Sequence, residues 1–238
     1  SSIVYFKRPV VFSLVGDVDM KWQRATTDTQ KELKKREIFE ATLFLFKEHG
    51  YDNVSFNMIA KHANFTKSNM YRYFSSKEDI FLSIFGEMFK VWQKDYVLAL
   101  KDFEENTEHN QFAQTWVRSY LDNPEFLDLI PILFIALERN SSYEQLFKFK
   151  EMSKGLLFEV AMEVKRVYPS LDIDDAFQII NSSFAITSNF WAATFQNESI
   201  RKIYENDEFK FMKPNFEKDV TTSIGLILRG LLINDTIK

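Results

Sequence analysis

The chain has 238 residues, of which 45% are hydrophobic, which is enough to bury a core in one large domain or two small ones. It has no cysteine, so disulfides and thiolate chemistry are excluded and a cytoplasmic location is expected. The formal net charge is −4, but residues 1–80 carry 13 Lys and Arg against 10 Asp and Glu. Any nucleic-acid surface is therefore expected in the N-terminal third. No membrane partner is expected, because no apolar run reaches the ~18–20 residues that span a bilayer.

Residues 1–19 do not fit the helical pattern of the rest of the chain. They have extended-strand character, and their apolar run after Lys7 and Arg8 imitates a weak signal sequence without a small-residue cleavage site. One interpretation is that they precede a start at Met20 and are not native. The other is an N-terminal arm that touches DNA or a partner subunit. We treat residues 1–27 as a leader outside the fold.

From Thr29 the chain is predicted to be helical nearly to its end, which is an all-α fold. Thr29 and Glu32 have the spacing of a capping box, and apolar residues follow from Ile38 at helical intervals. Gly50 supplies the left-handed stop that ends this first helix.

The next segment is predicted to form two short helices joined by a tight turn. Ser55 is a suitable N-cap for the first of them. The inner side of that helix carries Phe56, Ile59, Ala60 and Ala63. Asn64 occupies the turn position that needs positive φ, a conformation that Asn tolerates. Thr66 can cap the second helix, predicted over residues 67–74.

The helix over residues 67–74 has the composition of a DNA reader. Four basic residues and no acidic residue lie between Asn53 and Lys77, so the segment is suited to lie against phosphates. Helical spacing turns Phe65, Met70 and Phe74 inward and five polar side chains outward: Lys67, Ser68, Asn69, Arg72 and Tyr73.

Such a helix fits a major groove, where Lys67 can donate to guanine and Asn69 can pair with adenine or hold a phosphate. Tyr71 and Tyr73 offer hydroxyls to phosphates. Lys77 can clamp a phosphate together with the free amides of the helix that it begins. The alternative is that some of these are only surface residues and that Tyr71 belongs partly to the core.

These residues resemble the tetracycline-repressor (TetR/AcrR) family of bacterial transcriptional regulators. The resemblance rests on Ile38-Phe39-Glu40-Ala41-Thr42, Leu45-Phe46, Gly50-Tyr51, Ser55, Ile59-Ala60, Ala63-Asn64-Phe65-Thr66, Ser68-Asn69-Met70-Tyr71, Tyr73-Phe74, Ser76-Lys77-Glu78 and Ile80. Asn64, Thr66, Ser68 and Asn69 stand where the family usually has Gly, Ser, Gly and Thr. These departures affect helix geometry and base preference rather than the fold.

The resemblance implies two domains. A three-helix helix-turn-helix DNA-binding domain would occupy residues 28–76, and a helical ligand-binding and dimerisation domain residues 77–238. It also implies DNA contacts at eight positions, which are Ser55, Asn57, Lys67, Ser68, Asn69, Tyr71, Tyr73 and Lys77.

The part after residue 76 is predicted to be a bundle of long helices. Ser75 or Ser76 can cap the first of them, with Glu78 and Asp79 in the first turn, where the helix dipole favours acids. Its apolar stripe comprises Phe81, Ile84, Phe85, Met88, Phe89 and Trp92. Further helices are predicted over residues 110–121, 124–139, 142–167, 173–195 and 214–232. Pro131 should kink or end its helix, and residues 197–213 are predicted to be a long connection.

The last two long helices are expected to pair with those of a second subunit, as the resemblance implies. Their apolar stripes are Ala176, Ile180, Phe184, Thr187 and Trp191 on one helix, and Val220, Ile224, Ile227, Leu228 and Leu231 on the other. The alternative is a monomer whose own core uses these stripes. Operator symmetry favours a homodimer, because two half-sites need two readers about 34 Å apart.

Ten residues are predicted to line a cavity for a small apolar effector, although aromatic residues at helical spacing can equally be plain core. They are Phe89, Trp92, Tyr96, Phe112, Trp116, Phe134, Phe158, Met162, Phe190 and Trp191. No cofactor, metal site or catalysis is expected, because the three His lie far apart and no Gly-rich phosphate loop is present.

Three hypotheses follow for the function. The first is a dimeric repressor that a small hydrophobic effector releases from a palindromic operator in double-stranded DNA. The second is a DNA-bound scaffold that recruits a protein partner without a ligand. The third, an enzyme with an appended DNA-binding module, lacks any catalytic cluster to support it.

Overall fold

The computed structural model describes residues 22–234, with side chains from residue 29 to residue 233, and this part of the chain is helical without a strand. The α-helices are α1 (Trp22–His49), α2 (Phe56–His62), α3 (Lys67–Met70), α4 (Lys77–Lys101), α5 (His109–Leu121), α6 (Pro124–Ile132), α7 (Glu138–Asn140), α8 (Tyr143–Val167), α9 (Ile173–Ala192), α10 (Glu198–Glu205) and α11 (Phe216–Asn234). Two 3₁₀-helices, η1 (Tyr51–Asn53) and η3 (Lys210–Met212), and a π-helix, η2 (Leu133–Leu137), complete the list. The predicted all-α fold is confirmed, and residues 1–19 lie outside the described residues.

Helix α1 begins earlier than the sequence predicted. It starts at Trp22, so the predicted start at Thr29 is wrong. Residues 22–28 include no Gly or Pro that would stop a helix, so the helical conformation continues through the predicted cap. The predicted stop at Gly50 is confirmed by its φ of 73°, and its ψ of 163° puts it in a region that only glycine adopts readily.

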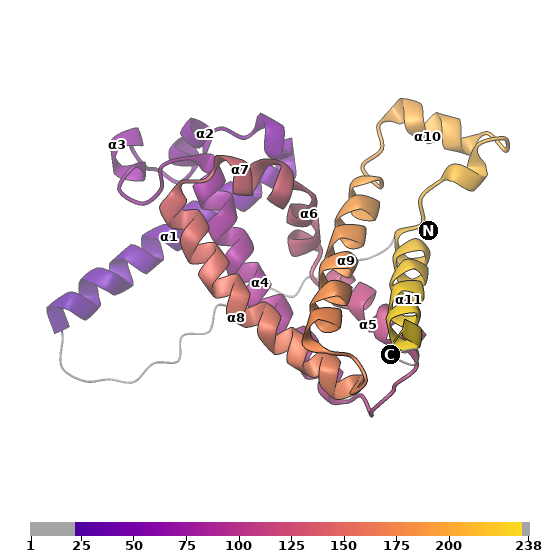
Figure 1. Ribbon diagram of the computed structural model, residues 1–238. Helices are drawn as coiled ribbons and strands as arrows, with labels where there is room; N and C mark the ends of the chain where they lie inside the picture. Colours follow the sequence, from indigo (N-terminus) through magenta and orange to yellow (C-terminus); the bar gives the residue numbers. More distant parts are fainter. Residues whose placement is uncertain (1–21, 235–238) are drawn as a thin grey trace.

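Helix α4 connects the two ends of the molecule. In Figure 1 it runs from beside α2 and α3 into the C-terminal bundle, with α8 packed along it. The predicted apolar stripe is confirmed, because Phe81, Phe85, Phe89 and Trp92 are all buried. The same face continues into Tyr96, which is also buried.

Helix α6 is interrupted as predicted. Its α-helical part ends at Ile132, directly after Pro131, and the chain continues as the π-helix η2. Proline lacks the N–H that would continue the α-helical ladder, so the register changes at this point. None of the described helices is long and apolar enough to cross a membrane.

The predicted long connection over residues 197–213 is wrong, because it contains α10 and η3. Asn197 caps α10 by accepting a hydrogen bond from the backbone N–H of Ile200 at 2.9 Å. The helix is short and bears mixed charges, which hid its period in the sequence. It has no buried residue and stands apart from the bundle, together with η3 (Figure 1).

The apolar stripes of α9 and α11 are used within the chain itself. Seven of the ten predicted dimer residues are buried among α5, α9 and α11: Ala176, Ile180, Thr187, Val220, Ile224, Leu228 and Leu231. These seven side chains therefore contribute to the core of the single chain, and the pairing of α9 and α11 with a second subunit stays a prediction. The outward face of α11 presents Leu226 and Ile233 to solvent, with Gly230 between them.

Candidate nucleic-acid interface and aromatic core

Three local features that were predicted from the sequence shape the helix-turn-helix: two helix caps and one turn residue with positive φ. Ser55 Oγ accepts a hydrogen bond from the N–H of Met58 at 3.2 Å and so caps α2. Thr66 Oγ1 accepts from the N–H of Asn69 at 3.2 Å and so caps α3. Asn64 has a φ of 58°, as the turn requires. The two caps fix the N-terminus of each helix, and Asn64 sets the turn between the end of α2 and the start of α3.

Helix α3 is shorter than the predicted helix over residues 67–74. One α-helical turn ends at Met70, and the amides of Arg72 and Tyr73 then bond to carbonyls three residues earlier, at 3.2 and 2.9 Å. This tighter winding is common at helix ends, because it satisfies carbonyls that lack a partner. The buried side chains of Met70 and Phe74 anchor the segment from below.

Six of the eight predicted DNA contacts are exposed on this unit, namely Ser55, Asn57, Lys67, Ser68, Asn69 and Tyr71. Tyr71 is 54% exposed, and its ring lies 5.0 Å from that of Phe56. It therefore leans on α2 without entering the core. Tyr73 is half-buried, with its ring 5.8 Å from Phe65. All eight contacts to DNA stay predictions.

The positive charge of this unit is not cancelled locally. Lys61, Lys67 and Arg72 are exposed, and none of them forms an ion pair with another described residue. Exposed cations without a partner carboxylate are favourable for binding to a phosphate backbone.

Lys77 has partners that the sequence did not reveal. Its Nζ donates to the backbone carbonyls of Tyr51 at 3.1 Å and Val54 at 3.0 Å, and lies 4.2 Å from the centroid of the Tyr51 ring. The Tyr51 hydroxyl donates to Glu78 at 3.0 Å, and burial together with the nearby Glu78 carboxylate raises the pKa of Tyr51. An ammonium has three N–H donors, so one is left for the predicted phosphate contact.

Replacing Lys77 with Ala is expected to lower the free energy of unfolding by about 1–2 kcal/mol, because η1 loses two charge-assisted hydrogen bonds and a cation–π contact to α4. If Lys77 also binds a phosphate, the affinity for all DNA sequences falls alike, and the salt slope decreases by about one charge. Thermal unfolding and a salt titration of DNA binding measure the two roles separately. Lys61→Ala, on the exposed side of α2, should leave the stability unchanged.

Asp79 forms an unexpected link between the two halves of the chain. It is only 1% exposed, and Ser76 caps its N–H at 3.1 Å, so the predicted cap is confirmed. Its carboxylate accepts from the N–H of Ser75 at 3.3 Å and from the N–H of Ser142, at the start of α8, at 2.7 Å. One buried carboxylate therefore ties the turn after α3 to the N-terminus of α8.

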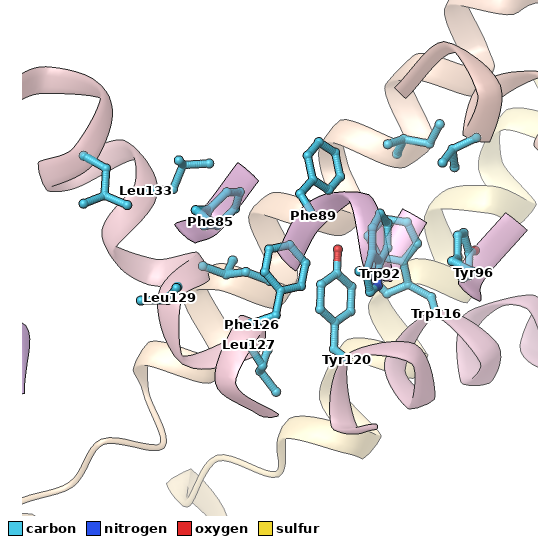
Figure 2. Packing of buried hydrophobic residues seen from close by; sticks show 14 of the residues in the cluster. Phe85, Phe89, Trp92, Tyr96, Trp116, Tyr120, Phe126, Leu127, Leu129 and Leu133 are labelled. Carbon is cyan, nitrogen blue, oxygen red and sulfur yellow. The ribbon is translucent and has the colours of Figure 1, made fainter. Parts of the chain in front are cut away.

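Half of the predicted effector residues meet in a closed aromatic core between α4 and α5. Phe89, Trp92, Tyr96, Phe112 and Trp116 are each at most 4% exposed. Figure 2 shows that Tyr120 and Phe126, which the sequence analysis did not select, belong to the same cluster. Their signal was present, because Phe112, Trp116 and Tyr120 follow one another at intervals of four residues.

The other five predicted effector residues do not join this core. Phe134, Phe158 and Met162 are about half exposed, at 48%, 50% and 48%. Phe190 and Trp191 are half-buried, and Trp191 Nε1 donates to Asp128 at 3.0 Å. The ten candidates are therefore divided between a buried cluster and more exposed positions, and their contact with an effector stays a prediction. Aromatic residues on neighbouring faces of a helix look alike in the sequence, and only packing separates them.

Polar groups within the core mostly have partners. Trp92 Nε1 donates to Ser119 Oγ at 2.8 Å, and Trp116 Nε1 donates to Thr187 Oγ1 on α9 at 2.9 Å. No group of three His, Asp or Glu residues suited to hold a metal occurs in the described part of the chain.

Two family models match the chain. Residues 38–84 match the model described as bacterial regulatory proteins of the tetR family, and residues 87–235 match the tetracyclin repressor-like C-terminal domain. Together they cover both the helix-turn-helix and the bundle.

Curated relatives match only a part of the chain. The Bacillus subtilis fatty acid metabolism regulator protein is 38% identical over 58 residues, which are 24% of this chain and 30% of that protein. The Escherichia coli regulator RutR is 30% identical over 89 residues, 37% of this chain and 40% of that protein. The chain thus spans well under half the length of these relatives.

A solved structure resembles the whole arrangement. FadR from Bacillus subtilis, in complex with stearoyl-CoA, has a TM-score of 0.52 and 18% sequence identity. The match covers 83% of this chain and 97% of the FadR chain. At this identity the likeness concerns the fold alone.

Proposed function

Because the chain belongs to the TetR family of bacterial transcriptional regulators, we propose that it is a homodimeric repressor that leaves a palindromic operator when a small apolar effector enters its aromatic core. Members of this family are DNA-binding regulators, so the binding of DNA by α2 and α3 is the premise. The dimer, the operator and the effector are the proposal. A bacterial regulator acts on the chromosome, and we therefore assign it to the cytoplasm.

The proposal rests on the path of α4 through the molecule. This helix of 25 residues begins at the cap beside the helix-turn-helix, and its inner face continues as Phe89, Trp92 and Tyr96 of the aromatic core. A displacement of the core can thus move the α3 reader through a single rigid element. A 100-fold loss of DNA affinity needs about 2.7 kcal/mol of coupling between effector and DNA.

The proposed dimer follows from the size of the reader. A single short helix offers too little contact for specific binding, and two half-sites lie about 34 Å apart on one side of the duplex. The exposed apolar residues Leu226 and Ile233 on α11 support a partner on this face, since Gly230 between them allows close helix approach.

The proposed effector is apolar because the core that would receive it is aromatic. Stearoyl-CoA is the ligand in the Bacillus subtilis FadR structure, and we use it here only as one compound to test for binding. No catalytic step is part of the proposal.

Sedimentation of the purified protein together with operator DNA tests whether it binds as a dimer, because it gives the number of chains bound to each duplex. Two chains per palindromic duplex, and one chain per isolated half-site at much lower affinity, are the expected results. Equal affinity for half-site and palindrome would contradict the homodimer while leaving DNA binding intact.

A second candidate is a ligand-independent scaffold that recruits a protein through the segment around α10. Phe195, Ile203, Phe211 and Met212 are all more than 45% exposed there, and Phe211 reaches 85%. If this candidate is correct, removal of these side chains abolishes regulation without changing DNA affinity.

A further inference from the structure

A groove of about 410 Å³ lies at the junction of α1, α4 and α8 and is lined by side chains from all three helices and from the turn after α3. Both halves of the molecule contribute to it, because Phe39 and Phe74 belong to the part matched by the N-terminal family model and Lys148 and Met152 to the part matched by the C-terminal one. Small-molecule sites are typically about 300–1,000 Å³ in volume and often lie where domains meet. The size and the place of this groove therefore suit a small ligand.

The floor of the groove is apolar. Phe74, Leu82 and Phe149 are buried along it, and Phe39 and Met152 are half-buried. The ring centroids of Phe39 and Phe74 lie 5.9 Å apart, so α1 and the turn after α3 form one continuous surface there. Covering such a surface with apolar atoms removes it from water and is favourable.

The rim of the groove carries an excess of positive charge. Four cations stand against two carboxylates, a balance of +2 on a chain of net charge −4: Lys35, Arg36, Lys90 and Lys148, with Glu32 and Glu87. A second groove, between α1 and the end of α2, has the opposite balance, with Lys34 against Glu37 and Glu40. The positive charge is therefore a property of the groove with the apolar floor.

The chain does not hold the cations of the rim strongly. Lys35 pairs with Glu32 at 2.8 Å and Lys90 with Glu87 at 2.7 Å, and the two lysine side chains are 40% and 47% exposed. Exposed pairs of this kind contribute little to stability, because water screens them. Lys148 is exposed and forms no ion pair with another residue that the structure describes. An anion in the groove thus finds cations that can turn toward it.

We propose that this groove binds a small amphipathic anion, in which an apolar chain covers the floor and one carboxylate or phosphate group lies among the cations of the rim. A neutral apolar compound would leave the rim charge unanswered, and an anion without a chain would leave the floor in water. The site is separate from the aromatic core, so the inference does not depend on the effector of the proposed function. Its ligand would contact α1, α4 and α8 together and so bind both halves of the molecule.

Titration calorimetry at low salt tests the chemistry of the ligand. Decanoate and decyl phosphate are the probes, used below the concentrations at which they form micelles, with 1-decanol and butyrate as controls. Both probes should bind the wild-type protein. 1-Decanol lacks the charge and should bind at least about fivefold more weakly. Butyrate is six methylene groups shorter than decanoate and should bind more than about 100-fold more weakly.

Two charge reversals on α8 test the place of binding. Lys148→Glu puts a carboxylate on the rim and should weaken decanoate binding at least about fivefold. Lys154→Glu is the matched control, because Lys154 is an exposed lysine of the same helix outside the groove. It changes the net charge of the protein equally and should leave the affinity for decanoate close to that of the wild type. Both positions are exposed, so both variants should fold with nearly unchanged Tm.

The outcomes separate this inference from the proposed function. Equal affinities of the two variants for decanoate would overturn it, because the ligand would then lie elsewhere, and an effector site in the aromatic core would be unaffected. Equal binding of decanoate and 1-decanol, or no binding of either anionic probe by the wild type, would overturn it as well. None of these results bears on the binding of DNA by α2 and α3.

Discussion

Replacing Asp79 with Ala is expected to lower the free energy of unfolding by about 3 kcal/mol. The change leaves the amides of Ser75 and Ser142 without the Asp79 carboxylate as their shared acceptor, and hydrogen bonds to a charged group are worth about 1.5–3 kcal/mol each. For a chain of this size that loss corresponds to a Tm lower by about 6–12 °C. Calorimetry of the ligand-free protein measures it directly.

Asp95 provides a matched control, because it is an exposed aspartate on the same helix. Asp95→Ala should change the free energy of unfolding by no more than about 0.5 kcal/mol. At temperatures where the Asp79 variant is fully folded, the effector should also lower its operator affinity less than it lowers that of the wild type. The reason is that α8 and the turn after α3 are no longer joined. A stable Asp79 variant with a normal response would show that this link carries neither stability nor coupling.

Replacing Lys67 with Ala is expected to weaken operator binding by at least about 30-fold. A lost base contact costs about 1–3 kcal/mol, and each subunit of the proposed dimer contributes one. The base preference at the contacted position should relax. Arg72→Ala, which removes an exposed cation from the turn after α3, should instead reduce the affinity for all sequences and lower the salt slope.

Fluorescence polarisation with operator duplexes substituted at single positions distinguishes these two effects. Lys94→Ala serves as the control, because Lys94 is an exposed lysine of α4 outside the helix-turn-helix. A Lys67 variant with wild-type affinity and wild-type base preference would exclude this side chain from base recognition.

The elements that local chemistry determines were predicted from the sequence. The caps at Ser55, Thr66 and Ser76 and the positive φ of Asn64 each depend on a residue and its neighbours within four positions. The apolar stripe of α4 follows from period alone. The family itself was identified by the resemblance of the residues from Ile38 to Ile80 to its motif, and the two family models confirm it.

The features that could not be predicted from the sequence depend on contacts between distant parts of the chain. The bond from Asp79 to Ser142 joins positions 63 residues apart, and the contact of Lys77 with Tyr51 joins positions 26 apart. Aromatic side chains such as Phe158 have the same helical spacing whether they face the core or solvent. The partition of the ten effector candidates into buried and exposed therefore required the packing of α4, α5, α8 and α9.

The most direct test of the central claim is selection of sheared genomic DNA from the source organism by the purified protein, followed by sequencing. The account predicts enrichment of one or a few palindromic sites whose half-sites are one helical turn apart, and loss of that enrichment with Lys67→Ala. Retention of DNA without a shared motif, or no retention even in low salt, would contradict the assignment of α2 and α3 as a sequence-specific reader.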